Sequence, residues 1–204
     1  MNRIDRTRCA LVLVDFQQRL MPTIHEAVAA VDEAVFLGEV AKILGIRVLG
    51  TEQNPAGLGP NLPRIRDLCA VTLAKMHFDA CKDGLLEALH HGEPEVGDVV
   101  IAGCEAHVCL LQTALGLRQA GRNVFVVAAA CGSRLPRDHE VAMRRLEGAG
   151  AVITSPEMVA FEWLDSCKDA AFKAVLGLLK HRTAARSTAP SSAMQHAAAA
   201  LGEG

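Results

Sequence analysis

The sequence is poor in aromatic residues and carries almost no net charge. Only 3% of its 204 residues are aromatic, and tyrosine is absent. Base-stacking surfaces that bind single-stranded nucleic acid are therefore not expected. The 21 Lys and Arg residues are balanced by 23 Asp and Glu residues, so the net charge is -2 and no general basic surface faces nucleic acid or an anionic membrane. We expect a small-molecule substrate, and further copies of the chain as protein partners.

Paired cysteines and long apolar runs are also lacking. The seven cysteines are odd in number and include no C-x-x-C pair, which argues against a disulfide framework or a zinc ribbon and favours a reducing, cytoplasmic location. An apolar run at 9–14 follows three arginines, as in a signal peptide, but Asp15 ends it after six residues. No run approaches the eighteen residues of a membrane-spanning helix.

What the sequence does contain is a series of short apolar segments separated by longer helical ones. Their uninterrupted apolar character is typical of parallel strands covered on both faces. The alternation predicts a doubly wound α/β fold, with a mostly parallel six-stranded sheet and helices on both faces. The predicted strands are 9–15, 46–51, 70–74, 98–103, 123–129 and 151–154.

Two helices and one domain boundary are also predicted. One apolar helix face is formed by Ile24, Val28, Val31 and Val35. A later helix is expected to begin near Asp138 and to place Ala142, Leu146 and Ala149 on one face. Residues 1–182 are interpreted as a single domain. Residues 183–204 are rich in Ala and Ser and lack a core-facing period, which predicts a mobile tail or a frayed terminal helix.

Polar residues follow several of the predicted strands. Asp15 ends the first strand, 51–55 follow the second, Lys75 follows the third, and 103–109 follow the fourth. The carboxyl ends of parallel strands share one edge of the sheet, where such folds bind their ligands. We expect these residues to converge there.

Cys109 is the strongest candidate nucleophile. It falls in the first turn of a helix predicted over 107–120, where backbone N–H groups and the helix dipole favour a thiolate. Lys75 would lower the thiol pKa further, and Asp15 could accept the proton. Each residue also has an ordinary structural interpretation, because free cysteines are commonly buried, an Asp can cap a turn and a strand-end Lys is usually solvated.

Five sequence strings, in order, resemble the signatures of the isochorismatase-like cysteine hydrolases, especially the isochorismatase domain-containing branch. The resemblance covers residues 8–180. The strings are VDFQ (14–17), TEQNPAGLGP (51–60), KMHFDAC (75–81), GCEAHVCLLQTALGL (103–117) and VVAAACGSR (126–134).

The resemblance implies a catalytic triad of Asp15, Lys75 and Cys109. In such enzymes the thiolate attacks an amide-type carbonyl, ammonia or an amine leaves, and water hydrolyses the acyl-enzyme. It also implies a non-proline cis peptide between Cys104 and Glu105, with the backbone N–H groups of Glu105 and Cys109 binding the oxyanion. No cofactor is implied, and relatives commonly form dimers or larger rings.

Two departures from the wider superfamily reduce the number of reactions that the resemblance allows. Isochorismatases that cleave a vinyl ether lack the nucleophilic cysteine, which is present here as Cys109. Nicotinamidases carry metal-binding histidines soon after the second strand, where this sequence has none between 51 and 63. Metal-assisted chemistry is therefore disfavoured, and no metal site is expected.

Four further residues are weaker candidates for substrate binding. Gln17 and Gln53 could orient a substrate amide or Asp15, or could equally satisfy loop backbone. Phe78 is interpreted as a pocket wall. His107 either contacts substrate or simply belongs to the first turn of its helix.

The main hypothesis is hydrolysis of a small-molecule amide-type carbon-nitrogen bond through a thioester. One alternative is a non-catalytic oligomeric scaffold or binding protein that retains the triad as a relic. A second is a thiol redox sensor, in which Cys104 would form a disulfide with Cys109.

Overall fold

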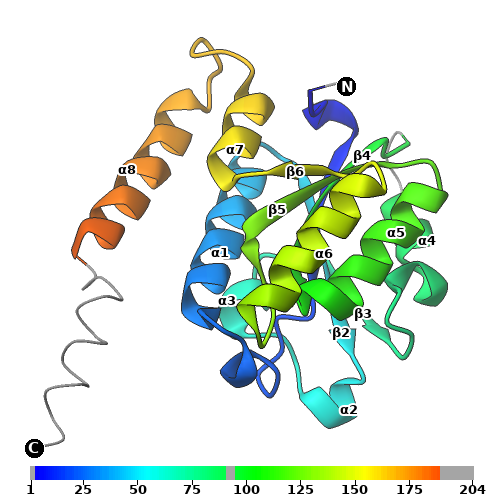
Figure 1. The fold of residues 1–204 in the computed structure, drawn as a ribbon. Coiled ribbons are helices and arrows are strands. Elements are labelled where there is room, and N and C mark those ends of the chain that lie inside the picture. Colours follow the sequence, from blue (N-terminus) through cyan, green and yellow to red (C-terminus); the bar gives the residue numbers. More distant parts are fainter. Residues whose placement is uncertain (1–2, 91–94, 189–204) are drawn as a thin grey trace, which may run out of the picture.

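A sheet of six parallel strands forms the centre of the molecule (Figure 1). The computed structural model describes residues 3–90 and 95–188. The strand order is β3-β2-β1-β4-β5-β6, and every neighbouring pair is parallel. This confirms the predicted doubly wound α/β fold. The strands are β1 (Cys9–Val14), β2 (Arg47–Gln53), β3 (Val71–Lys75), β4 (Asp98–Cys104), β5 (Asn123–Gly132) and β6 (Val152–Thr154).

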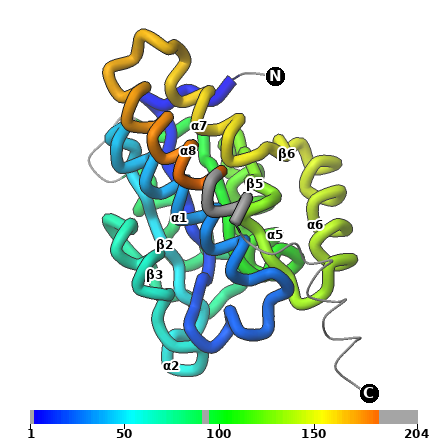
Figure 2. The backbone as a smooth tube through the Cα atoms, turned by 90° about the vertical axis from the view of Figure 1, so that its left-hand side faces the viewer, coloured from blue at the N-terminus to red at the C-terminus, as the bar shows by residue number. Residues whose placement is uncertain are grey.

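Helices cover both faces of this sheet (Figures 1 and 2). The longer helices are α1 (Ala27–Ile43), α5 (Leu111–Gln119), α6 (Pro136–Gly148), α7 (Pro156–Leu164) and α8 (Phe172–Thr188). The shorter ones are α2 (Pro55–Leu58), α3 (Pro63–Arg66) and α4 (Leu85–His90), with single turns at Arg6–Arg8, Met21–Thr23, Ala80–Asp83 and Ala106–Leu110. One apolar cluster joins the sheet to α1, α3, α7 and α8, and a second joins it to α4, α5 and α6.

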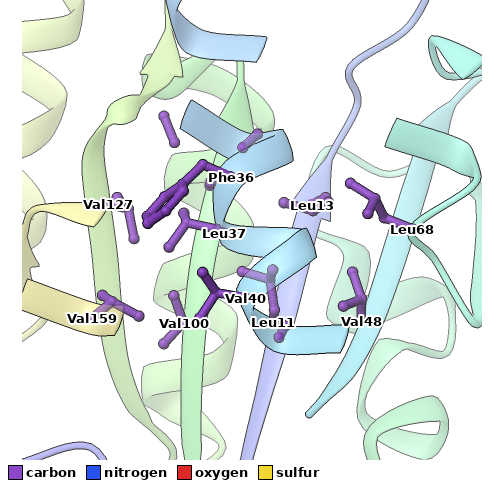
Figure 3. Packing of buried hydrophobic residues seen from close by; sticks show 14 of the residues in the cluster. Leu11, Leu13, Phe36, Leu37, Val40, Val48, Leu68, Val100, Val127 and Val159 are labelled. Carbon is purple, nitrogen blue, oxygen red and sulfur yellow. The ribbon is translucent and has the colours of Figure 1, made fainter. Parts of the chain in front are cut away.

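The central strands are buried on both faces, which explains their uninterrupted apolar sequence. All residues of β1 and β4 are buried. Figure 3 shows side chains from four strands meeting those of α1. The labelled residues of this cluster are Leu11, Leu13, Phe36, Leu37, Val40, Val48, Leu68, Val100, Val127 and Val159.

Both predicted helices form, with changes at their ends. Helix α1 begins at Ala27, after Ile24, and Val28 in its first turn is 74% exposed, so the predicted apolar face is wrong at that residue. Helix α6 begins at Pro136, where a missing N–H is harmless because the first turn has no acceptor for it. Ala149 lies just beyond its last residue and is exposed, unlike Ala142 and Leu146.

Helix α8 is held against α1 by a buried charge. The Arg182 guanidinium lies 2.8 Å from the carboxylate of Glu33, which is 2% exposed, and 4.9 Å from the ring centre of Phe36. The helix continues past residue 182 to Thr188, while 189–204 of the predicted tail lie outside the described residues. Within the described chain, no helix has the length and apolar character needed to traverse a bilayer.

The sheet reverses its winding between β1 and β4, whose carboxyl ends therefore border a crevice. The two strands approach unusually closely there at Gly103. Its φ is +149°, and a Cβ atom at this position would lie 2.2 Å from the carbonyl oxygen of Val14. Only glycine permits this backbone to sit beside Asp15.

We expect Gly103→Ala to lower the free energy of unfolding by at least about 2 kcal/mol, because β1 must move to admit the methyl group. Urea unfolding measures this. Gly177→Ala is the matched control: it lies inside α8 with nothing within 4 Å of its Cβ position. That control should stabilise the protein by about 0.4–1 kcal/mol. Equal effects of the two substitutions would contradict the close approach at Gly103.

Candidate active site

The ends of four adjacent strands bring the predicted residues together. Asp15 follows β1 directly, Gln53 and Lys75 are the last residues of β2 and β3, and Cys109 lies in the turn after β4. Asp15 has a φ of +53°, a left-handed conformation that turns the chain away from the strand. The convergence expected from the parallel sheet is thus present.

Asp15 and Lys75 form an ion pair that is completely shielded from solvent. The Lys75 Nζ lies 2.7 Å from Asp15 Oδ2, and neither side chain is exposed. Lys75 Nζ also donates to Gln53 Oε1 at 2.6 Å and to the carbonyl of His77 at 3.5 Å. The Thr51 hydroxyl donates to Asp15 Oδ1 at 2.7 Å. Because opposite charges pair and further polar groups surround them, this burial is tolerable.

Cys109 lies in a π-helical turn, Ala106–Leu110, that joins β4 to α5. The Glu105 carbonyl accepts hydrogen bonds from the N–H groups of Val108 at 3.0 Å and Leu110 at 3.2 Å, which flank Cys109. Turns of this kind occur often at functional sites. The peptide bond between Cys104 and Glu105 is cis, as the resemblance implies.

The surroundings of Cys109 favour the protonated thiol over the thiolate. Burial raises the pKa of the thiol to about 12; the Asp15 carboxylate raises it further, and the Lys75 ammonium opposes the rise. This direction is opposite to the lowered thiol pKa that the helix end and Lys75 lead one to expect. Two factors oppose the helix dipole: the loss of water around Cys109, a residue that is 6% exposed, and the negative charge of Asp15.

The two glutamines occupy different places in this network. Gln17 is fully buried, and its Nε2 donates to the carbonyls of Gln53 at 3.0 Å and Gly59 at 2.6 Å. Its Oε1 accepts from the Gln53 N–H at 2.8 Å, so this amide serves the loop backbone. The side chain of Gln53 instead reaches Lys75 and Cys109: its Oε1 accepts a hydrogen bond from Lys75 Nζ and lies 3.9 Å from Cys109 Sγ.

The remaining candidates are His107, Glu105 and Phe78, the first two in or next to the turn that contains Cys109. His107 Nδ1 is hydrogen bonded to Ser133 Oγ at 2.9 Å, which ties the turn to the residue after β5. The Glu105 carboxylate pairs with Arg134 at 2.7 Å. Phe78 is 50% exposed, close in sequence to Lys75. A cavity of about 240 Å³ is lined by Ser133 and not by Cys109, and the Cys109 residue is 6% exposed.

The residue that sequence reasoning did not single out is Thr51. It lies two positions before Gln53 on β2, and alternate strand residues share one face of a sheet. Both side chains therefore point at the same cluster, and the Thr51 hydroxyl holds Asp15. The signal available in the sequence was this spacing within the TEQ string.

The packing disfavours formation of a disulfide between Cys104 and Cys109. Cys104 belongs to the apolar cluster on the α1 face of the sheet, whereas Cys109 belongs to the cluster on the α5 face. All seven cysteines are free. Among residues 3–90 and 95–188, no group of three or more His, Cys, Asp or Glu side chains is placed to hold a metal ion.

Comparison with known families identifies the domain. The model of the isochorismatase domain matches residues 9–158. The chain belongs to the isochorismatase family. This membership confirms the resemblance seen in the sequence and supports a hydrolase-type role.

Named relatives of this family are similar along most of their length. Isochorismatase domain-containing protein 2 of Danio rerio is 31% identical over 181 residues, covering 88% of this chain and 91% of the relative. The Homo sapiens protein of the same name is 32% identical over 180 residues, covering 88% and 87%.

Solved structures show the same fold. A Caenorhabditis elegans protein described as MAR1 ribonuclease has a TM-score of 0.82 and 32% identity, covering 87% of this chain and 92% of its own. Escherichia coli YcaC, described as an octameric hydrolase of unknown specificity, has a TM-score of 0.77 and 24% identity, covering 92% and 98%.

We expect iodoacetamide to label Cys109 at least about tenfold more slowly than the exposed Cys167 at pH 7, because a thiol is a poor nucleophile. The Cys109 rate should then rise about tenfold per pH unit as the pH climbs toward about 12. Peptide mass spectrometry measures both rates. Faster labelling of Cys109 than of Cys167 at pH 7 would mean that a thiolate already exists in the free protein.

We expect Lys75→Met to lower the free energy of unfolding by about 3–5 kcal/mol, because it leaves the Asp15 carboxylate buried without a partner. Adding Asp15→Asn should recover part of this loss. Arg64→Met, which removes an exposed ion pair with Asp32, is the control and should change stability by less than about 1 kcal/mol. If Lys75→Met lowered the free energy of unfolding, measured with urea, no more than the control does, the buried pair would not be a structural requirement.

Proposed function

We propose that this chain is a cysteine hydrolase that cleaves an amide-type carbon-nitrogen bond of a small molecule through a thioester. The observation that carries the proposal is a buried contact network: Lys75 pairs with Asp15, and both Lys75 and Cys109 lie beside the side-chain oxygen of Gln53. The proposal requires no cofactor.

The reaction begins with a neutral thiol and an ionised Asp15. As Cys109 Sγ attacks the substrate carbonyl carbon, the thiol proton moves to Asp15, a carbon-sulfur bond forms, and an electron pair moves onto the carbonyl oxygen. In this step Lys75 supplies the positive charge beside the developing sulfur anion. Substrate binding would favour the transfer by aligning sulfur, carbonyl and carboxylate in one place.

The carbonyl oxygen becomes an anion that needs hydrogen-bond donors. We assign this role to the backbone N–H groups of Glu105 and Cys109. The turn supports the assignment, because the N–H groups of Val108 and Leu110, on either side of Cys109, are the ones that bond to the Glu105 carbonyl. Each such donor is worth about 3–4 kcal/mol in other acyl-transfer sites.

The intermediate then collapses toward products. Asp15 returns the proton to the nitrogen, the carbon-nitrogen bond breaks, and ammonia or an amine leaves a thioester on Cys109. Water next attacks the thioester and gives a proton to Asp15. The carbon-sulfur bond breaks, the carboxylic acid leaves, and the sulfur recovers its proton from Asp15. The atoms balance with water as the co-reactant.

The substrate is proposed to be small, and neither nucleic acid nor a membrane is proposed as a partner. The whole Cys109 residue is only 6% exposed, which favours a small substrate over a polymer. The C. elegans relative described as a ribonuclease makes RNA the polymer worth testing. Self-association into a dimer or larger assembly is proposed from the family resemblance alone.

The test is a panel of primary and secondary amides, with ammonia or amine release as the readout. Cys109→Ala should lower turnover by at least about 10³-fold, because the nucleophile is lost. Cys167→Ala, at an exposed thiol, is the control and should retain turnover. Intact-mass spectrometry should also show an acyl adduct on the wild-type protein and none on Cys109→Ala.

Two results would overturn the proposal. Turnover of no amide, together with no adduct, would favour the non-catalytic scaffold. Cleavage of RNA that survives Cys109→Ala would place a different activity on the same fold.

A further inference from the structure

One oxygen atom contacts two members of the buried cluster. Gln53 Oε1 accepts a hydrogen bond from Lys75 Nζ at 2.6 Å and lies 3.9 Å from Cys109 Sγ, within range of the thiol proton. Gln53 is 9% exposed, and neither Lys75 nor Asp15 is exposed beside it. A neutral acceptor thus stands between the ammonium and the nucleophile.

The orientation of this amide is fixed from its other end. Gln53 Nε2 donates to the carbonyl of Met76 at 2.9 Å, so the oxygen must face Lys75 and Cys109. The backbone of Gln53 is held as well, because Gln17 bonds to both its N–H and its carbonyl. Rotating the amide would break the Met76 bond and present N–H groups to an ammonium.

We propose that Gln53 is a positioning residue that keeps the Cys109 sulfur protonated and Lys75 seated on Asp15 until a substrate arrives. The reaction in which this matters rests on the proposed function. The contacts of Gln53 with Lys75 and Cys109 do not depend on the proposed function, because they exist in the protein without substrate.

The chemistry follows from the kind of atom involved. A carbonyl oxygen attracts the S–H hydrogen but repels a sulfur anion, so it favours the thiol over the thiolate. It also occupies one of the three donors of the Lys75 ammonium, which would otherwise be free to pair with a thiolate. The charged groups that act on Cys109 are Asp15 at the end of β1 and Lys75 at the end of β3, and Gln53 reaches it from β2 between them.

Two substitutions of Gln53 should change the reactivity of the Cys109 thiol in opposite directions. Gln53→Met keeps the length of the side chain but removes the acceptor, so Cys109 should react with iodoacetamide about three- to tenfold faster at pH 7.5, the size expected for one lost hydrogen bond. Gln53→Glu keeps an acceptor and adds negative charge, so the same rate should fall. The rate is followed against pH by mass spectrometry of the Cys109 peptide.

Measuring amide turnover as well distinguishes a positioning role of Gln53 from a purely structural one. Gln53→Met should raise alkylation and yet lower kcat, because Lys75 is no longer held on Asp15. A purely structural role would lower kcat without moving the pH dependence of alkylation. Gln112→Met, at an exposed glutamine on α5, is the matched control and should alter neither.

Unchanged pH dependence in both Gln53 variants would overturn the inference, as would shifts of the same sign. If Gln53→Met fails to fold, judged by its circular dichroism spectrum, the slower labelling expected of Gln53→Glu still decides the question. If no amide is hydrolysed but the opposite shifts appear, the proposed function fails and the positioning role of Gln53 stands.

Discussion

The ion pair between Asp15 and Lys75 is the constraint around which the site is arranged. Its two members come from β1 and β3, which are separated by β2, so the pair spans the width of an intervening strand. Such a bridge is feasible only where parallel strands end at one edge. The side chains of β2 fill the space beneath it, with Thr51 on the carboxylate and Gln53 on the ammonium. The cluster is neutral overall, which makes its complete burial tolerable.

The same burial favours the protonated form of the Cys109 thiol. A sulfur held beside an anionic carboxylate and away from water keeps its proton, even at the start of a helix. A resting protein of this design would be protected from adventitious alkylation and oxidation, because both need a thiolate. Cys104, the nearest thiol in sequence at this sheet edge, packs on the opposite face of the sheet, so the two sulfurs do not share an environment.

The sequence predicted the sheet well because its signals are local. The apolar runs that became β1 and β4 have no polar alternation, and this character follows from being covered on both sides. Asp15, Lys75 and Cys109 could be named from strand ends and from family strings. The side-chain surroundings could not be predicted, because they depend on distant elements. Three features arise from such packing: the exposure of Val28, the hydrogen bond from Gln17 Nε2 to the Gly59 carbonyl, and the raised pKa of Cys109.

Lys75 comes from β3, one of the two edge strands of the sheet, and Lys75 itself is the one buried residue of that strand. A strand with a single neighbour and mostly unburied residues frays locally at a lower free energy than global unfolding. If the last residues of β3 detached, the Lys75 ammonium would leave the site while the other five strands stayed intact. On heating, the Lys75–Asp15 contact would then be lost before the core melts cooperatively, and amide hydrogen exchange along β3 would be faster than along β1 or β4.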